Sequence, residues 1–488
     1  MLSRSIAFTI SFFLAGVIAG NFFIAPPLAL FVSFLFGLLL VLVLNGDLKA
    51  LAVFWAALFG GWLCFTAALP DYADAGKIYH YVGEQSFTAE VLAASSRESW
   101  QNLTVKTVEL NGYGRPVSGK VSLSAPLYPE YRSGDLIKIN CELENYPLPA
   151  TGYDRYLFKD NIFTVCGYDS EIKKIGERLT IGRALSFLSD GLKGIIGRSL
   201  AEPAAAILSG ILLNRTEDMP KDISNQLSFL GLTHIIAISG SHLVIIMAIL
   251  AELFIFFGVS RRQSFWPVVA LIIFYVILVG APASAVRSAV MAILVLWAQR
   301  LGRPSATKNI LLLTAAILAL FNPKILLYDL GFELSFLAVV GLTWLSPIFK
   351  KLLAVKFIPE SLQEIIAATL SAQILTYPLI FNSFGNFSWW SLPANLLILS
   401  TVPALMALGI IQLLVGIFCL PLARLIGLAL WLIIKYWLVV VNFLSGMPGA
   451  QIKLENFSVA LMLIFYLLIF SFYRVFRKLT SEKVKNLL

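Results

Sequence analysis

Residues 229 to 243 read Phe-Leu-Gly-Leu-Thr-His-Ile-Ile-Ala-Ile-Ser-Gly-Ser-His-Leu, and an apolar run follows them immediately. This stretch places two of the three histidines of the chain, His234 and His242, on either side of Ser239 and Gly240. Polar groups at membrane depth are costly, so they indicate function. A glycine-broken helix is tolerated there only inside protein or beside a water-filled cavity. The stretch therefore predicts a polar break in a helix of a membrane domain.

The composition of the 488-residue chain is that of a polytopic membrane protein. Hydrophobic residues make up 58% of it and charged residues only 13%, whereas soluble domains are roughly one quarter charged. The four cysteines form no CxxC pair, and three histidines cannot build a histidine-rich metal site. We therefore expect neither a metal nor another cofactor. The chain also has no GxxxxGK[ST] loop, which predicts that it contains no ATP-driven motor.

Apolar runs of membrane-spanning length define two helical regions. Residues 1–70 contain three such runs, and residues 181–488 form a larger helical membrane domain that ends in a short cytoplasmic tail. We expect roughly 10–12 spans in total, with broken or re-entrant helices among them. The later apolar segments are 240–258, 265–280, 283–299, 309–321, 331–349, 366–384, 393–420, 425–445 and 457–474.

Residues 71–180 differ from the rest because their charges are regular and their apolar runs are short and alternating. Apolar and polar residues alternate from Ile137 to Leu143, as in a half-buried strand. Similar short strands are expected at 86–92, 103–110, 119–124 and 161–168. Five short strands predict a small β-barrel, with an OB-like fold among the candidates.

The aromatic residues of this domain allow two interpretations. They are either core and turn residues or stacking faces for single-stranded nucleic acid. The domain contains 12 Lys or Arg against 15 Asp or Glu, a net charge of −3, whereas a dedicated DNA-binding barrel is normally basic. The aromatic residues concerned are Trp100, Tyr113, Tyr128, Tyr131, Tyr153 and Tyr156.

Positive charges predict the topology. Lysines and arginines fall in every second loop between the apolar segments, which is the pattern of cytoplasmic loops. This places the 71–180 domain outside and both termini in the cytoplasm. Cys141 and Cys166 are the only cysteines of the domain, and an oxidising compartment favours a disulfide between them.

Several motifs resemble those of the ComEC-type competence proteins. The first is the stretch around His234 and His242, preceded by Leu208–Arg215 (Leu-Ser-Gly-Ile-Leu-Leu-Asn-Arg). Further matches follow in the order of the family, and the resemblance covers about residues 20–470. They are Gly280–Arg287, Gly331–Val339, Ser371–Pro378, Phe384-Gly385 and Pro393-Ala-Asn395, with Gly134-Asp135 and Tyr153–Leu157 in the soluble segment.

The resemblance implies an inner-membrane channel for single-stranded DNA in natural transformation, and not an enzyme. It also implies contact with membrane lipids, a separate DNA receptor, a separate nuclease and a cytoplasmic helicase or strand-binding protein, and it allows a homo-oligomer. Ser241 and Glu333 depart from the usual leucine and glutamine of the family. No His-x-His-x-Asp-His motif is present, so we expect a form without the metallo-β-lactamase-like domain.

Two other functions remain open at this point. Broken helices with embedded charges are also typical of secondary transporters of anionic solutes. A membrane-embedded hydrolase would use Ser239 and His242. Arg287 lies within a predicted span, where it either contacts DNA phosphates or pairs with Glu333. The functional candidates are His234, Ser239, Gly240, His242, Arg287, Glu333, Ser335 and Asn395.

Overall fold

The computed structural model describes residues 4–23, 25–96, 100–110, 116–145, 152–167, 170–260, 262–302, 307–354, 359–448, 452–453 and 457–485. The chain forms two compact units. The first unit comprises Met1–Gly191 with Val290–Leu330, and the second comprises Leu192–Ala289 with Gly331–Leu488.

Three apolar helices begin the first unit: α1 (Arg4–Phe22), α2 (Pro27–Val43) and α3 (Gly46–Ala67). The backbones of helices α1 and α3 are in direct contact at two glycines. A Cβ atom on Gly16 would lie 1.9 Å from the Leu58 carbonyl oxygen, and one on Gly61 would lie 2.0 Å from that of Phe13. Small residues of this kind let membrane helices approach closely, so the glycines determine how this pair packs.

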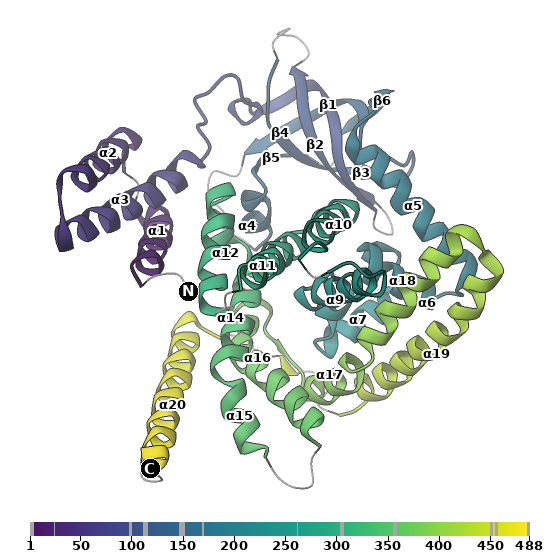
Figure 1. The fold of residues 1–488 in the computed structure, drawn as a ribbon. Helices are drawn as coiled ribbons and strands as arrows, with labels where there is room; N and C mark the ends of the chain where they lie inside the picture. Colours follow the sequence, from purple (N-terminus) through teal and green to yellow (C-terminus); the bar gives the residue numbers. More distant parts are fainter. Residues whose placement is uncertain are drawn as a thin grey trace. The chain divides into compact units, whose positions relative to one another are not determined.

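A small β-barrel follows, at the top of Figure 1. Strands β1, β2, β3, β5 and β4 are neighbours in that order, and β1 also pairs with β4, which closes the ring. The β3–β5 pair is parallel and the others are antiparallel. A sixth strand, β6, extends the sheet beyond β4. The strands are β1 (Gly83–Ser96), β2 (Trp100–Leu110), β3 (Lys120–Pro126), β4 (Asp135–Asn145), β5 (Ile162–Cys166) and β6 (Glu171–Glu177).

The apolar residues of the alternating pattern fill the interior of this barrel. Burial alternates along β2 and β4. The side chains that point into the barrel are fully buried, and they include Phe87, Leu103, Val121, Ile137 and Ile139. Strand side chains point to opposite faces in turn, which explains the pattern. The predicted class, a helical membrane protein with a small β-barrel, is confirmed.

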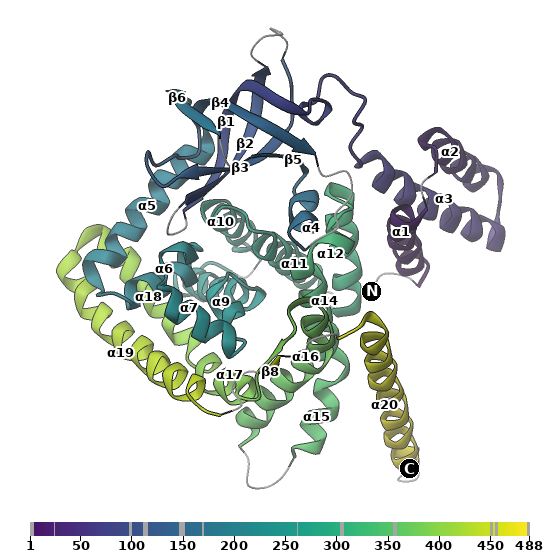
Figure 2. The ribbon, with the colours of Figure 1, turned by 180° about the vertical axis from the view of Figure 1, so that it is seen from behind.

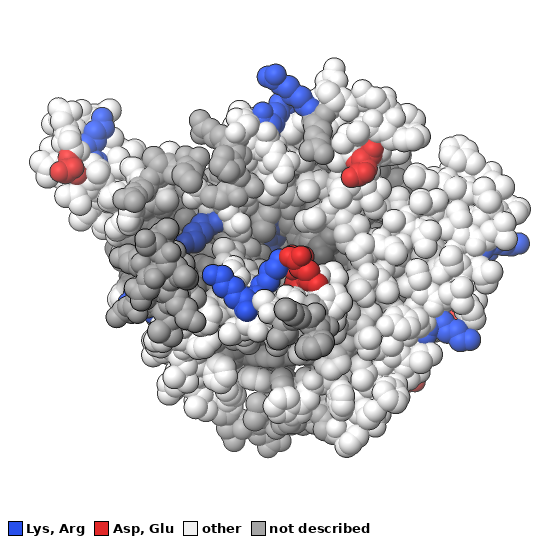
Figure 3. Space-filling view, turned by 60° about the horizontal axis from the view of Figure 1, so that its bottom comes forward, with Lys and Arg blue, Asp and Glu red and all other residues white. Residues whose placement is uncertain are grey.

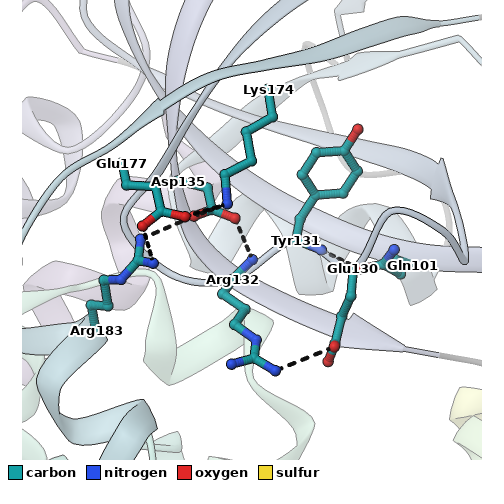
Figure 4. Close-up of polar contacts among 8 residues, drawn as sticks. All are labelled: Gln101, Glu130, Tyr131, Arg132, Asp135, Lys174, Glu177 and Arg183. Atoms are coloured by element: carbon teal, nitrogen blue, oxygen red, sulfur yellow. Dashed lines mark hydrogen bonds and ion pairs between the residues drawn. The ribbon is translucent and has the colours of Figure 1, made fainter.

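A buried carboxylate joins the barrel to the next helix, α5 (Ile181–Ser199). Asp135 is fully buried, and one of its carboxylate oxygens lies 2.9 Å from Lys174 Nζ and 3.1 Å from Arg183 Nη1. Its other oxygen accepts the backbone N–H of Arg132, and Glu177 contacts both cationic side chains (Figure 4). Because a buried charge must be paired, this network fixes the start of α5 against the barrel.

Three further helices complete the first unit. Helix α4 (Gly152–Lys159) connects β4 to β5, and α12 (Thr307–Phe321) leads into the short α13 (Ile325–Tyr328). Helix α4 packs against both α13 and β5, and both ribbon views show it between the barrel and α12 (Figures 1 and 2). Residues far apart in the sequence therefore meet beneath the barrel.

Among its described residues, the second unit contains helices and the two-residue strands β7 (Asn386–Phe387) and β8 (Ile452–Lys453). All ten residues of α6 are buried, and its core also includes residues of α7, α8, α17, α18 and α19. The helices are α6 (Ala204–Leu213), α7 (Lys221–Phe229), α8 (Thr233–Ile236), α9 (Gly240–Phe256), α10 (Phe265–Leu278), α11 (Ala283–Arg300, shared with the first unit), α14 (Leu330–Trp344), α15 (Ser346–Leu352), α16 (Glu360–Phe384), α17 (Ser391–Leu399), α18 (Val402–Phe418), α19 (Leu420–Ser445) and α20 (Val459–Lys485).

Within the described ranges, five helices are long and apolar enough to cross a membrane, or up to seven if each of two bent pairs is one span. Five more apolar helices are shorter, at 10–17 residues. Some of the expected 10–12 spans are therefore full-length helices in the structure, and the others are bent pairs or shorter helices. Figure 3 shows a face on which uncharged residues predominate and Lys, Arg, Asp and Glu side chains are few.

Candidate functional site

The predicted helix break lies between α8 and α9. Ser239 is the extended N-cap residue of α9, with φ −116° and ψ 173°. Its side chain accepts the backbone N–H of His242, and its own N–H donates to His242 Nδ1 at 3.1 Å. This reciprocal arrangement is a capping box. Because Nδ1 accepts, the proton of the neutral His242 ring is on Nε2.

His234 uses its ring in the opposite way. Its Nδ1 lies 2.9 Å from the carbonyl oxygen of Gly231, and a carbonyl can only accept, so Nδ1 donates. The neutral ring therefore has its lone pair on Nε2. The side chain of His234 is exposed, whereas that of His242 is only 1% exposed. Of the two histidines, His234 is thus the one available to a ligand.

A second set of polar groups centres on Ser391, at the start of α17. Gln373 of α16 donates its side-chain N–H to Ser391 Oγ at 3.0 Å. Asn395 donates to the Ser391 carbonyl oxygen at 2.8 Å and also lies 3.3 Å from the hydroxyl. Ser391 and Asn395 are 5% and 2% exposed. A buried hydrogen-bonded network of this kind fixes the relative positions of α16 and α17.

Two glycines bring the helix break to these groups. A Cβ atom on Gly231 would lie 2.9 Å from Ser391 Oγ, so the loop before α8 touches α17. A Cβ atom on Gly240 would lie 3.3 Å from Ser288 Oγ, so the start of α9 touches α11. Four segments thus meet in one apolar unit. We call this the polar cluster; its members are Gly231, His234, Ser239, Gly240, His242, Ser288, Gln373, Ser391 and Asn395.

The remaining candidates lie on α11 and α14. Arg287 adjoins Ser288 and is 5% exposed. Glu333 and Ser335 are partly buried on α14, and Glu333 lies near enough to Tyr466 of α20 for their charges to interact. The pairing of Arg287 with Glu333 stays a prediction.

Sequence reasoning missed Ser288, Gln373 and Ser391. Gln373 lies within the Ser371–Pro378 motif, and Ser391 lies two residues before Pro393. The signal that could have identified them is a polar residue within or beside an apolar helical run. Among the described residues, no three His, Cys, Asp or Glu side chains lie close enough together to hold a metal ion.

The Ser391→Ala variant tests the polar cluster. Removal of the buried Ser391 hydroxyl leaves the partly buried Gln373 amide without this partner, which should cost about 1–3 kcal/mol of stability. Thermal unfolding of the purified protein in detergent measures the loss. Ser400→Ala is the matched control, because Ser400 is exposed just after the same helix and bonds only a nearby carbonyl. Equal unfolding temperatures for the two variants would contradict the role of Ser391.

The barrel aromatic residues separate into two kinds. Tyr131 is only 3% exposed and belongs to the core, whereas Trp100 and Tyr128 are 44% and 79% exposed. Tyr156 is about half exposed, with Lys159 Nζ 4.7 Å from its ring centre. Tyr113 and the side chain of Tyr153 lie outside the described residues.

A buried glutamine holds the loop that presents Tyr128. Gln101 is fully buried, its Oε1 accepts the Tyr131 N–H at 3.0 Å, and its Nε2 lies 2.8 Å from the carbonyl oxygens of Pro126 and Leu127. Figure 4 shows Gln101 beside Tyr131, next to the Asp135 network. Two exposed aromatic rings, Trp100 and Tyr128, are thus placed on backbone fixed from within the barrel.

Cys141 of β4 and Cys166 of β5 form a disulfide, with Cα atoms 5.8 Å apart. The cysteines lie on paired strands, in which Leu143 is the register partner of Cys166. The other two cysteines, Cys64 and Cys419, are free. The bond therefore links two strands of the barrel wall, and it is the type of bond expected outside the cytoplasm.

Taken together, the fold and the polar cluster define a helical membrane protein that encloses buried polar groups and has a small β-barrel appended. Residues 211–479 match the family model described as "Competence protein", which is more than half of the chain. The chain belongs to this competence protein family and is ComEC-like.

One curated relative is ComE operon protein 3 of Bacillus subtilis (strain 168), which is 28% identical over 254 residues. The alignment covers 51% of this chain and 31% of that relative. No solved structure matches the chain. Membership of the family implies a role in natural transformation.

Proposed function

We propose that this protein conducts single-stranded DNA across the cytoplasmic membrane during natural transformation. The observation that supports this most directly is the polar cluster: every member lies within residues 211–479, the part that matches the family. Polar groups held at helix breaks are tolerated in a membrane where they line a cavity. The cluster contains uncharged donors and acceptors, which suit a path that a charged strand must enter and leave.

In this proposal the barrel receives the strand on the outside. Trp100 and Tyr128 offer aromatic faces to bases, and stacking contributes about 1–3 kcal/mol per base without sequence preference. Because the described barrel is not strongly basic, affinity would rest on stacking more than on phosphate contacts. The disulfide supports an extracytoplasmic barrel, and the positive loops support cytoplasmic termini.

We infer further that the chain acts without a catalytic step. The Ser239 hydroxyl and the His242 Nδ1 are both engaged in the capping box that starts α9. A nucleophilic serine needs a base within hydrogen-bond reach of its hydroxyl, and here the His242 Nδ1 accepts a backbone N–H instead. A separate nuclease, receptor and helicase or strand-binding protein would complete the pathway.

The test is DNA uptake in a deletion strain of the host. Fluorescent DNA is followed into the cytoplasm in cells that express the parent chain, the Trp100→Ala/Tyr128→Ala variant or no copy. We expect uptake with the parent, a loss without it, and at least a tenfold reduction with the variant. The Val108→Ala variant is the control, since Val108 is also an exposed apolar residue of β2. Normal cytoplasmic uptake in the deletion strain would sink the proposal, as would solute accumulation in vesicles without DNA binding.

A further inference from the structure

Residues 322–329, which connect α12 to α14, lie against the barrel and are here called the 322–329 connection. This connection includes α13, which packs against α4. Asn322 donates its side-chain N–H to the Lys159 carbonyl oxygen at 2.6 Å, and Arg155 donates to the Leu327 carbonyl oxygen at 3.1 Å. The contacts therefore run in both directions across α4, from side chains to backbone.

Lys324 is the centre of this contact. It is fully buried, and its Nζ donates to the side-chain oxygen of Asn161, between α4 and β5. The same Nζ lies 4.9 Å from the ring centre of Phe158 and 4.5 Å from that of Phe163. Cation–π attraction of this kind is strongest where water is excluded. One ammonium group thus contacts the end of α4, the turn and β5 at once.

The charge of Lys324 is retained near neutral pH. Burial and, to a smaller extent, the charge of Lys120 lower the pKa of Lys324 to about 8, whereas Asp160 opposes this change. A buried ammonium is costly unless it is bonded, and its replacement by an apolar group of similar size is often neutral or stabilising. Stability alone therefore does not explain a lysine here. A charged group with one amide and two rings around it instead specifies a single geometry.

Neighbouring contacts connect the 322–329 connection to the N-terminal helix α1 as well. Lys159 Nζ lies 3.4 Å from Asp329, and both side chains are nearly buried, at 11% and 6% exposed. The Tyr328 ring lies 4.8 Å from that of Phe158, and the Tyr328 hydroxyl donates to the Asn21 side chain of α1. The 322–329 connection is thus tied to the barrel on one side and to α1 on the other.

We propose that the 322–329 connection is the mount that fixes the position of the β-barrel relative to α1 and α12, with Lys324 as its positioning residue. The mount also places residues 322–329 on the same side of the membrane as the barrel. Its value for DNA delivery rests on the function proposed above, because a receiving domain must be held in one place to pass a strand on. The fixed position of the barrel itself does not depend on DNA.

The experiment measures the distance between two spin labels in the full-length protein. The labels occupy Lys173→Cys on β6 and Lys308→Cys on α12, which are both exposed, in a background with Cys64→Ser and Cys419→Ser. We expect one narrow distance distribution for the parent and at least a twofold broader one for Lys324→Met. Melting temperature should change little. Lys106→Met, at an exposed lysine of β2, is the matched control and should leave the distribution narrow.

A second pair of variants keeps the test decisive if Lys324→Met fails to insert. Asn161 has φ 60°, a left-handed conformation that glycine adopts freely. Asn161→Gly removes the amide and keeps the lysine, so it should broaden the distribution, whereas Asn161→Asp retains an acceptor and should leave it narrow. An unchanged width in both Lys324→Met and Asn161→Gly would overturn the mount, even if DNA uptake were lost. Broadened distances with normal uptake would support the mount and count against the proposed DNA path.

Discussion

The Gly341→Val variant is expected to lose the packing of the second unit. A Cβ atom on Gly341 of α14 would lie 2.2 Å from the Ser371 carbonyl oxygen of α16, so the backbones of the two helices are in direct contact. A backbone atom cannot rotate away as a side chain can, and the helices must separate. Overpacking typically costs 1–3 kcal/mol, and a contact this short should cost about 3 kcal/mol or more.

Thermal unfolding and gel filtration in detergent measure this loss. Gly197→Val is the matched control, because Gly197 is also helical but has no heavy atom within 4 Å of its Cβ position. The control shares the helix-propensity cost of replacing glycine with a β-branched residue. The difference between the variants therefore isolates the helix contact. A Gly341→Val protein as stable as the control would show that α14 and α16 do not touch at this point.

Loss of the disulfide is expected to weaken the barrel by about 3 kcal/mol, since it closes a loop over 25 residues. Cys141→Ala with Cys166→Ala should lower the unfolding temperature of the barrel, and a reducing agent should lower that of the parent similarly. Cys64→Ala with Cys419→Ala is the control and should not respond, because these two cysteines are free.

Thiol labelling of the denatured, unreduced protein gives an independent measurement. With the disulfide formed, only Cys64 and Cys419 should react. Modification of Cys141 and Cys166 before reduction would contradict the bond and would remove one support for an extracytoplasmic barrel. The two readouts are separate because labelling reports the bond itself, whereas unfolding reports its energetic effect.

Local patterns in the sequence predicted the local parts of this structure. Alternation around Ile137 and Ile139 predicted a barrel strand because neighbouring side chains of a strand face opposite sides. The glycine at 240 predicted the helix break. The capping box was not foreseen, although Ser239 and His242 stand three residues apart, because His is an unusual third residue of that motif.

Contacts between distant segments could not be predicted from patterns. Ser391 and Gly231 are 160 residues apart, and nothing in either local sequence specifies that they meet. No pattern in the sequence singles out Lys324, and only the fold shows that it is buried against two aromatic rings. Span number was also difficult, because the short helices α10 and α12 are as apolar as full spans but are only 14 and 15 residues long.

The contact between Asn161 and Lys324 joins residues that are 163 positions apart in the chain. Ribosomes add roughly 5–20 residues per second, so the barrel side of the contact exists for about 8–33 s before Lys324 is synthesised. Throughout this interval the rings of Phe158 and Phe163 lack their cation–π contact with the Lys324 ammonium group. On the topology proposed above, the barrel side of this contact is therefore synthesised well before α12 and Lys324. The docking of the 322–329 connection onto the barrel is thus expected to be a late step in the assembly of the first unit.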